Sequence, residues 1–419
     1  MVAKTDIKFY VHSNNNAPQL TNNFGCMLSV LDAALINGIQ VGTVSSMTAS
    51  GNIVTAVFGT AHNLMPYQVI KITGANQTEY NIEARILTVP NATTITFELA
   101  VAPTVTTATG TISCSLPPLG WEKPFSSTSA TGGKGAYRSK NTLLSSRPFL
   151  RVVDELDPAY TSTYAKYAKV GIVEDMTDID TMLGVQAPYN AADPNRNWVA
   201  TGSGATVING WARWYYARND NAHSSSTSDM STPPTNNRAW VLVGNSDYFY
   251  ILPSQTGSGS AFPYGFGSFK SFLNADNSNT FLASTLAYVA ANATGNIYYN
   301  ISLGVTDYLS SYLLLQRNYA QTSNFKTAAC FSMQVSNSQM YSGTTNYIGA
   351  YSLNNIAPFA PVMVNESVLR GEMPNIYYLF QLRPYSNSQL IEKDGAIYMA
   401  RNIFGPAVEG QIVLKVGDL

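Results

Sequence analysis

The chain has 419 residues, which is enough for two or three domains with sizeable hydrophobic cores. Hydrophobic residues make up 45% of it and exclude wholesale disorder, whereas charged residues make up only 12%, against a usual share of roughly 25%. The formal net charge is −1 and no Lys/Arg-rich block occurs, so the composition argues against a protein that binds nucleic acid through its phosphates. Ser, Thr, Asn and Gly supply the polarity instead, which suits an all-β protein or one that buries much surface against neighbours.

Cysteine usage and the N-terminus indicate assembly in a reducing cytoplasm. Cys26, Cys114 and Cys330 lie far apart and form no CxxC pair. This excludes a zinc ribbon and argues against a disulfide framework, so three buried thiols are expected. The first residues lack the apolar core of a signal peptide, and no apolar run approaches the ~20 residues of a transmembrane helix. No membrane partner is therefore expected.

The chain opens with one predicted strand, Ile7–Val11, and one predicted helix, Gly25–Asn37. A single apolar stripe at helical spacing runs along the helix: Met27, Val30, Leu31, Ala34 and Leu35. Asn22 or Asn23 could cap its start, and Gly38 is well placed to end it. Packing on a sheet of the same protein is the prediction, ahead of binding to a partner.

Residues 43–115 read as a small, self-contained all-β module. Apolar runs alternate with turn residues at nearly even spacing: Ile53–Phe58, Gln68–Thr73, Ile82–Val89, Thr94–Leu99 and Thr109–Cys114. In the fourth run Ile95, Phe97 and Leu99 share one face, which is the period-2 pattern of a half-buried strand. Gly, Asn and Pro supply turn geometry between the runs. The module holds no cluster of groups that could do chemistry.

Four short blocks of this module occur in a familiar order: Ala61-His62-Asn63-Leu64, Ile72-Thr73-Gly74-Ala75, Tyr80-Asn81 and Thr93–Phe97. In that order they resemble a small β module that recurs in tailed-bacteriophage virion proteins. This chain has Met65-Pro66-Tyr67 where that module carries a glycine-bearing turn. The module appears in several kinds of virion part, so the resemblance implies a virion protein better than it implies which part.

Residues 116–145 are rich in Pro, Ser, Thr and Gly, which predicts a long loop or an ordered clamp between domains. Four blocks from here onward resemble a group of uncharacterised phage structural proteins: Gly120–Phe125, Lys134–Ser139, Trp240–Gly244 and Leu369–Tyr377. In the last block Asn375 stands where glycine is usual. The resemblance implies that a larger C-terminal β domain follows the module.

From residue 146 onward, strand-like runs and aromatic residues dominate. The candidate strands are Phe149–Val153, Tyr167–Val173, Ala239–Val243, Tyr248–Leu252, Ile297–Ser302, Ala329–Val335 and Ile376–Leu382. The predicted fold class is mainly β, a multi-domain sandwich- or barrel-like architecture with a short N-terminal amphipathic helix. The predicted parts are an N-terminal segment (1–42), the β module (43–115), the linker or clamp (116–145) and a larger β domain (146–419).

No catalytic, cofactor-binding or metal site is predicted. The three histidines are far apart, at His12, His62 and His223, and no nucleotide-binding or hydrolase motif occurs. Two acidic patches, Asp154–Asp157 and Glu174–Asp180, could supply carboxylates for polysaccharide hydrolysis or for calcium, but solvated loops explain them more simply. The run Asn274–Asn279 imitates part of a calcium loop and lacks its glycine and glutamate.

An aromatic patch is the one candidate contact for a ligand or partner. Trp211, Trp214, Tyr215 and Tyr216 could stack on a host glycan, although packing in the core or between subunits is the commoner use of such residues.

The function expected from these features is that of a non-enzymatic structural component of a tailed-phage virion, assembling as a multimer in the neck, tail or baseplate region. Its partners would be further copies of the chain and other virion proteins, joined in the host bacterial cytoplasm. Neither nucleic acid nor a membrane is an expected partner. The alternatives are a capsid decoration protein, a tail protein that binds a host glycan or receptor, and a polysaccharide depolymerase that uses Asp175, Asp178 or Asp180.

Overall fold

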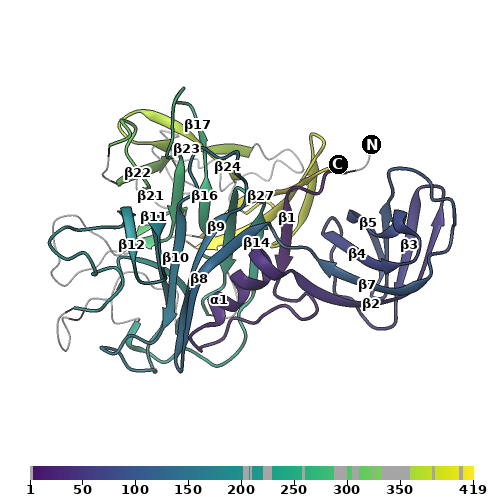
Figure 1. Ribbon diagram of the computed structural model, residues 1–419, viewed down its shortest axis with the longest axis horizontal. Coiled ribbons are helices and arrows are strands. Elements are labelled where there is room, and N and C mark those ends of the chain that lie inside the picture. Colours follow the sequence, from purple (N-terminus) through teal and green to yellow (C-terminus); the bar gives the residue numbers. More distant parts are fainter. Residues whose placement is uncertain are drawn as a thin grey trace, which may run out of the picture.

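The computed structural model describes residues 3–201, 207, 210–219, 229–256, 260–286, 300–303, 311–322, 325–331, 359–379, 383–404 and 409–419. Within these residues the protein is mainly β, as the sequence predicts, with three antiparallel sheets and a short helix near the N-terminus. Figure 1 shows the sheets as a small lobe beside a larger body.

The small lobe is a closed barrel of six strands in the order β2-β3-β6-β5-β4-β7 (Figure 1). Its elements are β2 Ile39–Ser50, β3 Ile53–Phe58, β4 Val69–Ala75, the 3-10 turn η2 Thr78–Tyr80, β5 Glu83–Asn91, β6 Thr94–Glu98 and β7 Gly110–Leu116. Ile95 and Phe97 point inward from β6, which confirms the period-2 pattern. Five of the strands overlap predicted ones, and β2 is the strand that the sequence pattern does not single out. Ile39 pairs with Leu116, so the chain enters and leaves the barrel at one point.

The segment before the barrel belongs to the larger body. β1 Lys8–Val11 confirms the first predicted strand and pairs with β14 Trp240–Gly244. The predicted helix is present as α1 Cys26–Leu31, which continues with π-helical geometry as η1 Asp32–Asn37. All five residues of the predicted stripe are buried, so the helix packs within its own protein, as expected.

The sequence predicts the residue that ends this helix correctly but not the residue that caps its start. Gly38 ends it at a positive φ of 76°, where glycine meets no steric penalty. The predicted cap at Asn22 or Asn23 is wrong, because Gly25 takes the N-cap position and has no side chain to offer. A carboxylate from a distant strand accepts the hydrogen bond of the first turn instead.

Eight strands form the second sheet, and α1 lies against it. They are β8 Trp121–Ser129, β9 Gly132–Ser139, β10 Phe149–Glu155, β11 Lys166–Met176, β12 Met182–Ala187, β13 Ala212–Ala217, β19 Thr285–Leu286 and β20 Asn300–Ile301. β10 and β11 confirm two of the predicted strands.

The prediction of a long loop over 116–145 is wrong, because β8 and β9 form a hairpin there. Its Ser and Thr residues alternate outward on the edge strand β8. Its glycines allow close packing: a Cβ on Gly132 would lie 2.1 Å from the carbonyl oxygen of Asp154, and Gly135 lies under the side chain of Leu28. The glycines therefore allow the helix and a neighbouring strand to approach this hairpin closely. Composition alone predicts a loop here because it does not reveal those contacts.

The remaining strands form a sheet of thirteen within the described residues. Besides β1 and β14 they are β15 Tyr248–Pro253, β16 Tyr264–Ser268, β17 Lys270–Ser271, β18 Thr280–Ala283, β21 Ser311–Leu315, β22 Lys326–Phe331, β23 Phe359–Asn365, β24 Leu369–Leu379, β25 Leu390–Lys393, β26 Ala396–Phe404 and β27 Glu409–Asp418. β14, β15, β22 and β24 overlap predicted strands. The parts of the predictions at 297–299, 332–335 and 380–382 lie outside the described residues.

Arg85 joins the barrel to the body. It projects from β5 and is 3% exposed, and its guanidinium donates only to backbone carbonyls. These oxygens belong to Lys4 and Ile7 before β1, to Tyr67 of the barrel and to Val416 of β27, at 2.6 to 3.0 Å. Because these carbonyls come from three separate parts of the fold, this side chain ties the barrel to the body, together with contacts such as those of Lys8 with Glu83 and of Gln68 with the carbonyl of Phe9.

Candidate functional site

The aromatic patch of the sequence lies in the interior. Trp214, Tyr215 and Tyr216 are on β13, a strand buried on both faces, and Trp211 immediately before it is 7% exposed. Trp214 donates through Nε1 to the carbonyl of Ala283 at 2.8 Å. A ring that stacks on a glycan must present a face to solvent, so the position of these residues corrects the hypothesis of a glycan contact. The run Trp214–Ala217, four consecutive aromatic or apolar residues without polar alternation, is the available signal for a doubly buried strand.

Asp154, from the first acidic patch, is buried between α1 and β13. Its Oδ2 accepts from the backbone amide of Met27 at 3.0 Å, and its Oδ1 accepts from the hydroxyl of Tyr216 at 2.7 Å. The carboxylate thus supplies the acceptor that no residue next to the helix provides. Burial raises the pKa of Asp154 to about 6, although its hydrogen-bond donors act in the opposite direction.

The pKa of Asp154 predicts a pH dependence of stability. Its folded value of about 6 lies above the unfolded value near 3.9, so the folded state binds this proton more tightly. Stability from this group is therefore present below pH 4 and lost as the pH rises through 6. We expect the free energy of unfolding of the wild type, relative to that of Asp154→Asn, to rise by roughly 2–3 kcal/mol when the pH is lowered from 7 to 4. Urea unfolding of both proteins measures this difference. If the unfolding free energies of the two proteins changed equally between pH 4 and 6, the shift could not be assigned to Asp154.

The second acidic patch is tied into structural contacts. Asp178 and Asp180 lie in the turn between β11 and β12. Asp178 accepts backbone amides of that turn, and Asp180 accepts from Lys134 at 2.8 Å and Arg151 at 2.6 Å. Asp175 accepts the neighbouring amide of Met176. Burial opposes ionisation of Asp180, but the two cations outweigh it and lower its pKa.

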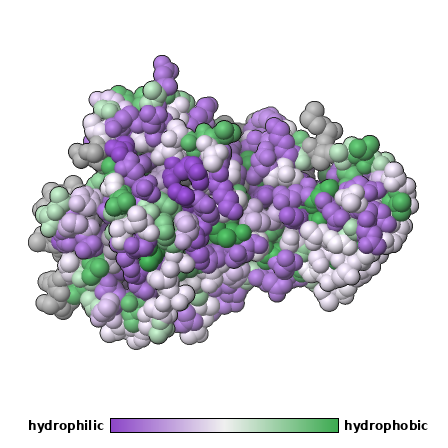
Figure 2. Space-filling view, in the orientation of Figure 1, coloured by the Kyte–Doolittle hydropathy of each residue, from purple (hydrophilic) through white to green (hydrophobic). Residues whose placement is uncertain are grey.

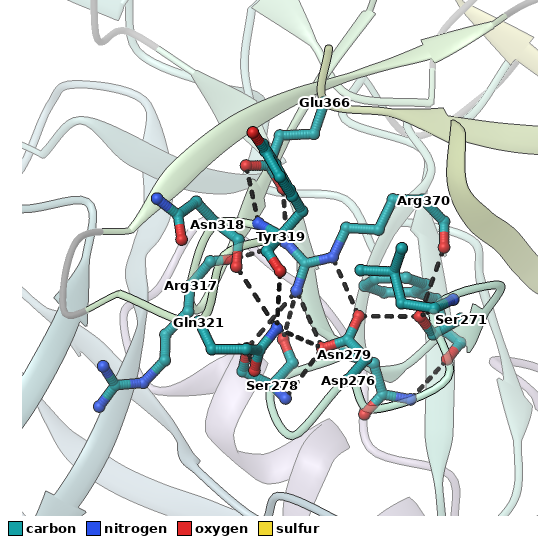
Figure 3. Close-up of polar contacts among 12 residues, drawn as sticks. Ser271, Asp276, Ser278, Asn279, Arg317, Asn318, Tyr319, Gln321, Glu366 and Arg370 are labelled. Atoms are coloured by element: carbon teal, nitrogen blue, oxygen red, sulfur yellow. Dashed lines mark hydrogen bonds and ion pairs between the residues drawn. The ribbon is translucent and has the colours of Figure 1, made fainter. Parts of the chain in front are cut away.

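The most elaborate polar cluster surrounds Arg370 (Figure 3). The guanidinium donates to both oxygens of Asp276 at 3.0 Å and to Glu366 at 2.6 Å, and all three side chains are at most 1% exposed. Its other hydrogen bonds go to the carbonyls of Arg317 and Ser278 and to the hydroxyl of Ser278. Burial alone would raise the pKa of Asp276, but Arg370 holds it below its usual value. The partner of the Asp276 carboxylate is thus the guanidinium of Arg370.

This cluster, the Arg370 network, fastens three connections that are far apart in sequence: the segment between β17 and β18, the one after β21, and the β23–β24 turn. Exposed hydrophobic side chains lie on or next to these connections: Phe272 (43% exposed), Tyr319 (48%), Val368 (38%) and Leu369 (52%). We call these four residues the apolar rim. A rigid support beneath exposed apolar groups is the arrangement found at protein–protein contacts.

Two residues of the phage-like motifs occupy unusual backbone conformations. Tyr67 has a φ of 67° in the turn where the phage module carries glycine, and Asn375 has a φ of 55° where glycine is usual. Glycine and asparagine enter this left-handed region most readily, whereas tyrosine does so at a cost. The hydroxyl of Tyr67 donates to Glu392 on β25, and Asn375 donates to the hydroxyl of Tyr248 at 2.6 Å. These contacts hold both residues in place.

Within the described part of the chain, no group of three or more His, Cys, Asp or Glu residues is arranged to hold a metal ion. In the same residues, no helix combines the length and apolarity that crossing a membrane requires. Cys26 is partly buried, Cys114 and Cys330 are fully buried, and all three are free thiols.

Comparison with solved structures adds a structural likeness. No protein-family model matches the chain, and no curated protein does. Among solved structures, the chain is similar to an endosialidase of phage phi92, with 10% sequence identity and a TM-score of 0.16. The match covers 91% of this chain and 52% of that one, so this chain spans about half of the length of its match. A likeness at this TM-score defines neither a common fold nor a common activity.

Proposed function

We propose that the chain is a non-enzymatic structural component of a tailed-phage virion that assembles as a multimer in the neck, tail or baseplate region. The observation that carries this proposal is the structural role of residues in the motif that resembles those of phage structural proteins. Arg370 organises the buried network, and Asn375 keeps the backbone conformation that the usual glycine would have. A framework role for these motifs supports a protein whose job is to hold a shape.

The charged residues support the same proposal. Among the carboxylates offered by the sequence for polysaccharide hydrolysis, Asp178 accepts hydrogen bonds from turn amides and Asp180 forms ion pairs. Asp154 has a raised pKa, but it is fully buried and accepts from the amide of Met27 and the hydroxyl of Tyr216. A catalytic pair needs one carboxyl kept protonated near neutral pH and another free to attack or to activate water. Asp180 has instead a lowered pKa beside two cations.

For the assembly contact, the apolar rim is the surface that we assign to a neighbouring subunit. The four residues are exposed in the single chain, and their connections are held by the Arg370 network. Little side-chain order would be lost when a neighbour packs there, because the backbone is already fixed. The sequence suggests the aromatic patch as a partner contact, but that patch is buried, and we assign the contact to the apolar rim in its place.

Mass spectrometry of purified virions tests the proposal. We expect this chain in the particle at a copy number that is a multiple of three, five or six, as symmetric virion parts require. Its absence from purified particles would refute the proposal. A cryo-EM map then decides between the neck, tail or baseplate and the alternative of capsid decoration, and it shows whether the apolar rim contacts a neighbour.

A further inference from the structure

A shallow groove on the barrel has an apolar floor and acidic edges. It encloses about 500 Å³ between η2, the start of β5 and the connection that follows β6. Ile82 and Leu99 contribute to its lining, and Val101 stands on its wall with 77% of its surface exposed. Figure 2 shows hydrophobic residues exposed on the barrel lobe, which this view presents at the right.

The charges at the groove are all of one sign. Glu79, Glu83 and Glu98 line it, and no Lys or Arg is among the lining residues. Lys8 pairs with Glu83 at 3.1 Å. Glu79 and Glu98 form no ion pair with any residue that the structure describes; they accept hydrogen bonds from Thr104 and Asn52. The carboxylates of Glu79 and Glu98, beside the apolar floor, are therefore available to pair with a cationic group of a ligand.

The groove is preformed. The hydroxyl of Tyr80 donates to the carbonyl of Val105 at 2.8 Å, and the amide of Leu99 donates to the carbonyl of Asn52 at 2.8 Å. Thr104 donates to Glu79 at 3.2 Å across the groove. These bonds tie the connection after β6 to the rest of the barrel at both ends, so a ligand need not order it.

We propose that this groove binds an extended segment of a neighbouring protein in which an aliphatic side chain is flanked by Lys or Arg. The aliphatic group would cover Val101 and Ile82, while the flanking cations would meet Glu79 and Glu98. The single sign of the edge charges excludes anionic ligands such as phosphate or an acidic peptide. The inference rests on the proposed assembly role in taking a protein as the occupant, and it places one partner contact on the barrel, away from the apolar rim.

The test uses the full chain and a fluorescein-labelled peptide, Lys-Val-Lys-Val-Lys, with binding followed by fluorescence anisotropy. We expect saturable binding that weakens as salt rises, and that weakens at least about tenfold in the double variant Glu79→Lys/Glu98→Lys, because like charges would face each other. Val101→Ser should weaken it several-fold by removing apolar contact. Peptides of the same length, Lys-Ser-Lys-Ser-Lys and Glu-Val-Glu-Val-Glu, should bind weakly or not at all.

Two matched variants in the body serve as controls: Leu143→Ser, at a residue 92% exposed, and Asp193→Lys. Both should keep wild-type affinity. Equal binding of the three peptides, or equal effects of groove and control variants, would overturn the proposal. So would self-association that Val101→Ser abolishes, because it would seat a second copy in the groove. Because the assay uses purified protein, absence of the chain from virions would refute the proposed function and leave this binding unchanged.

Discussion

Replacing Arg370 by Met is expected to destabilise the body by about 3–5 kcal/mol, because it leaves the buried carboxylates of Asp276 and Glu366 without a cation. The loss should be larger at pH 8 than at pH 5, since unpaired buried carboxylates have raised pKa values and take up protons as the pH falls. Urea unfolding followed by tryptophan fluorescence measures it. The five tryptophans all lie outside the barrel, so the signal reports the body: Trp121, Trp198, Trp211, Trp214 and Trp240.

The matched control is Lys270→Met. Lys270 lies on β17 beside the network, but its side chain is 72% exposed and its ion pair with Glu372 is 3.7 Å long. Exposed pairs of this kind contribute about 0–1 kcal/mol, so this variant should unfold close to wild type. If Arg370→Met cost no more than Lys270→Met, the network could not be the support of the three connections.

Replacing Arg85 by Met is expected to loosen the barrel from the body. The substitution removes the hydrogen bonds that Arg85 donates to the carbonyls of Lys4, Ile7, Tyr67 and Val416. Each buried carbonyl left without a partner costs about 1–3 kcal/mol, and water would enter the junction to replace the donor. Hydrogen exchange followed by mass spectrometry should show faster exchange in residues 4–11 and in the end of β27, while the barrel interior keeps its protection.

Lys71→Met is the control for this experiment, since Lys71 is an exposed residue of the neighbouring barrel strand β4. It should leave exchange at the junction unchanged. Arg85→Lys should give an intermediate result, because an ammonium has three donors in place of five and lacks the planar fork. Wild-type exchange rates at the junction in Arg85→Met would show that other contacts hold the barrel.

Local pattern was sufficient for those elements that local chemistry controls. The period-2 runs of the module became barrel strands, because alternate side chains of a strand must face opposite sides. The stripe from Met27 to Leu35 became a helix that ends at Gly38, because helical spacing and a positive φ are both properties of neighbouring residues. The mainly β class follows from the same patterns repeated along the chain.

Contacts between distant residues decided the rest. The Ser/Thr/Gly composition of 116–145 predicts a loop, but the glycines of β9 allow α1 and β10 to approach, and that hairpin is visible only once the helix is in place. The aromatic run of β13 offers sugar-stacking residues by type, and its burial depends on the sheet and helix that enclose it.

The sequence by itself determined the β class, five of the six barrel strands and the helix, because each depends on residues within a few positions of one another. Tertiary structure alone decided which charges are buried together and which surfaces stay open. Asp276 and Arg370 are 94 residues apart, and Glu79 shares its groove with Val101 across a turn and two strands. The free energy of such contacts depends on distance and burial in space, and residue order along the chain does not specify either.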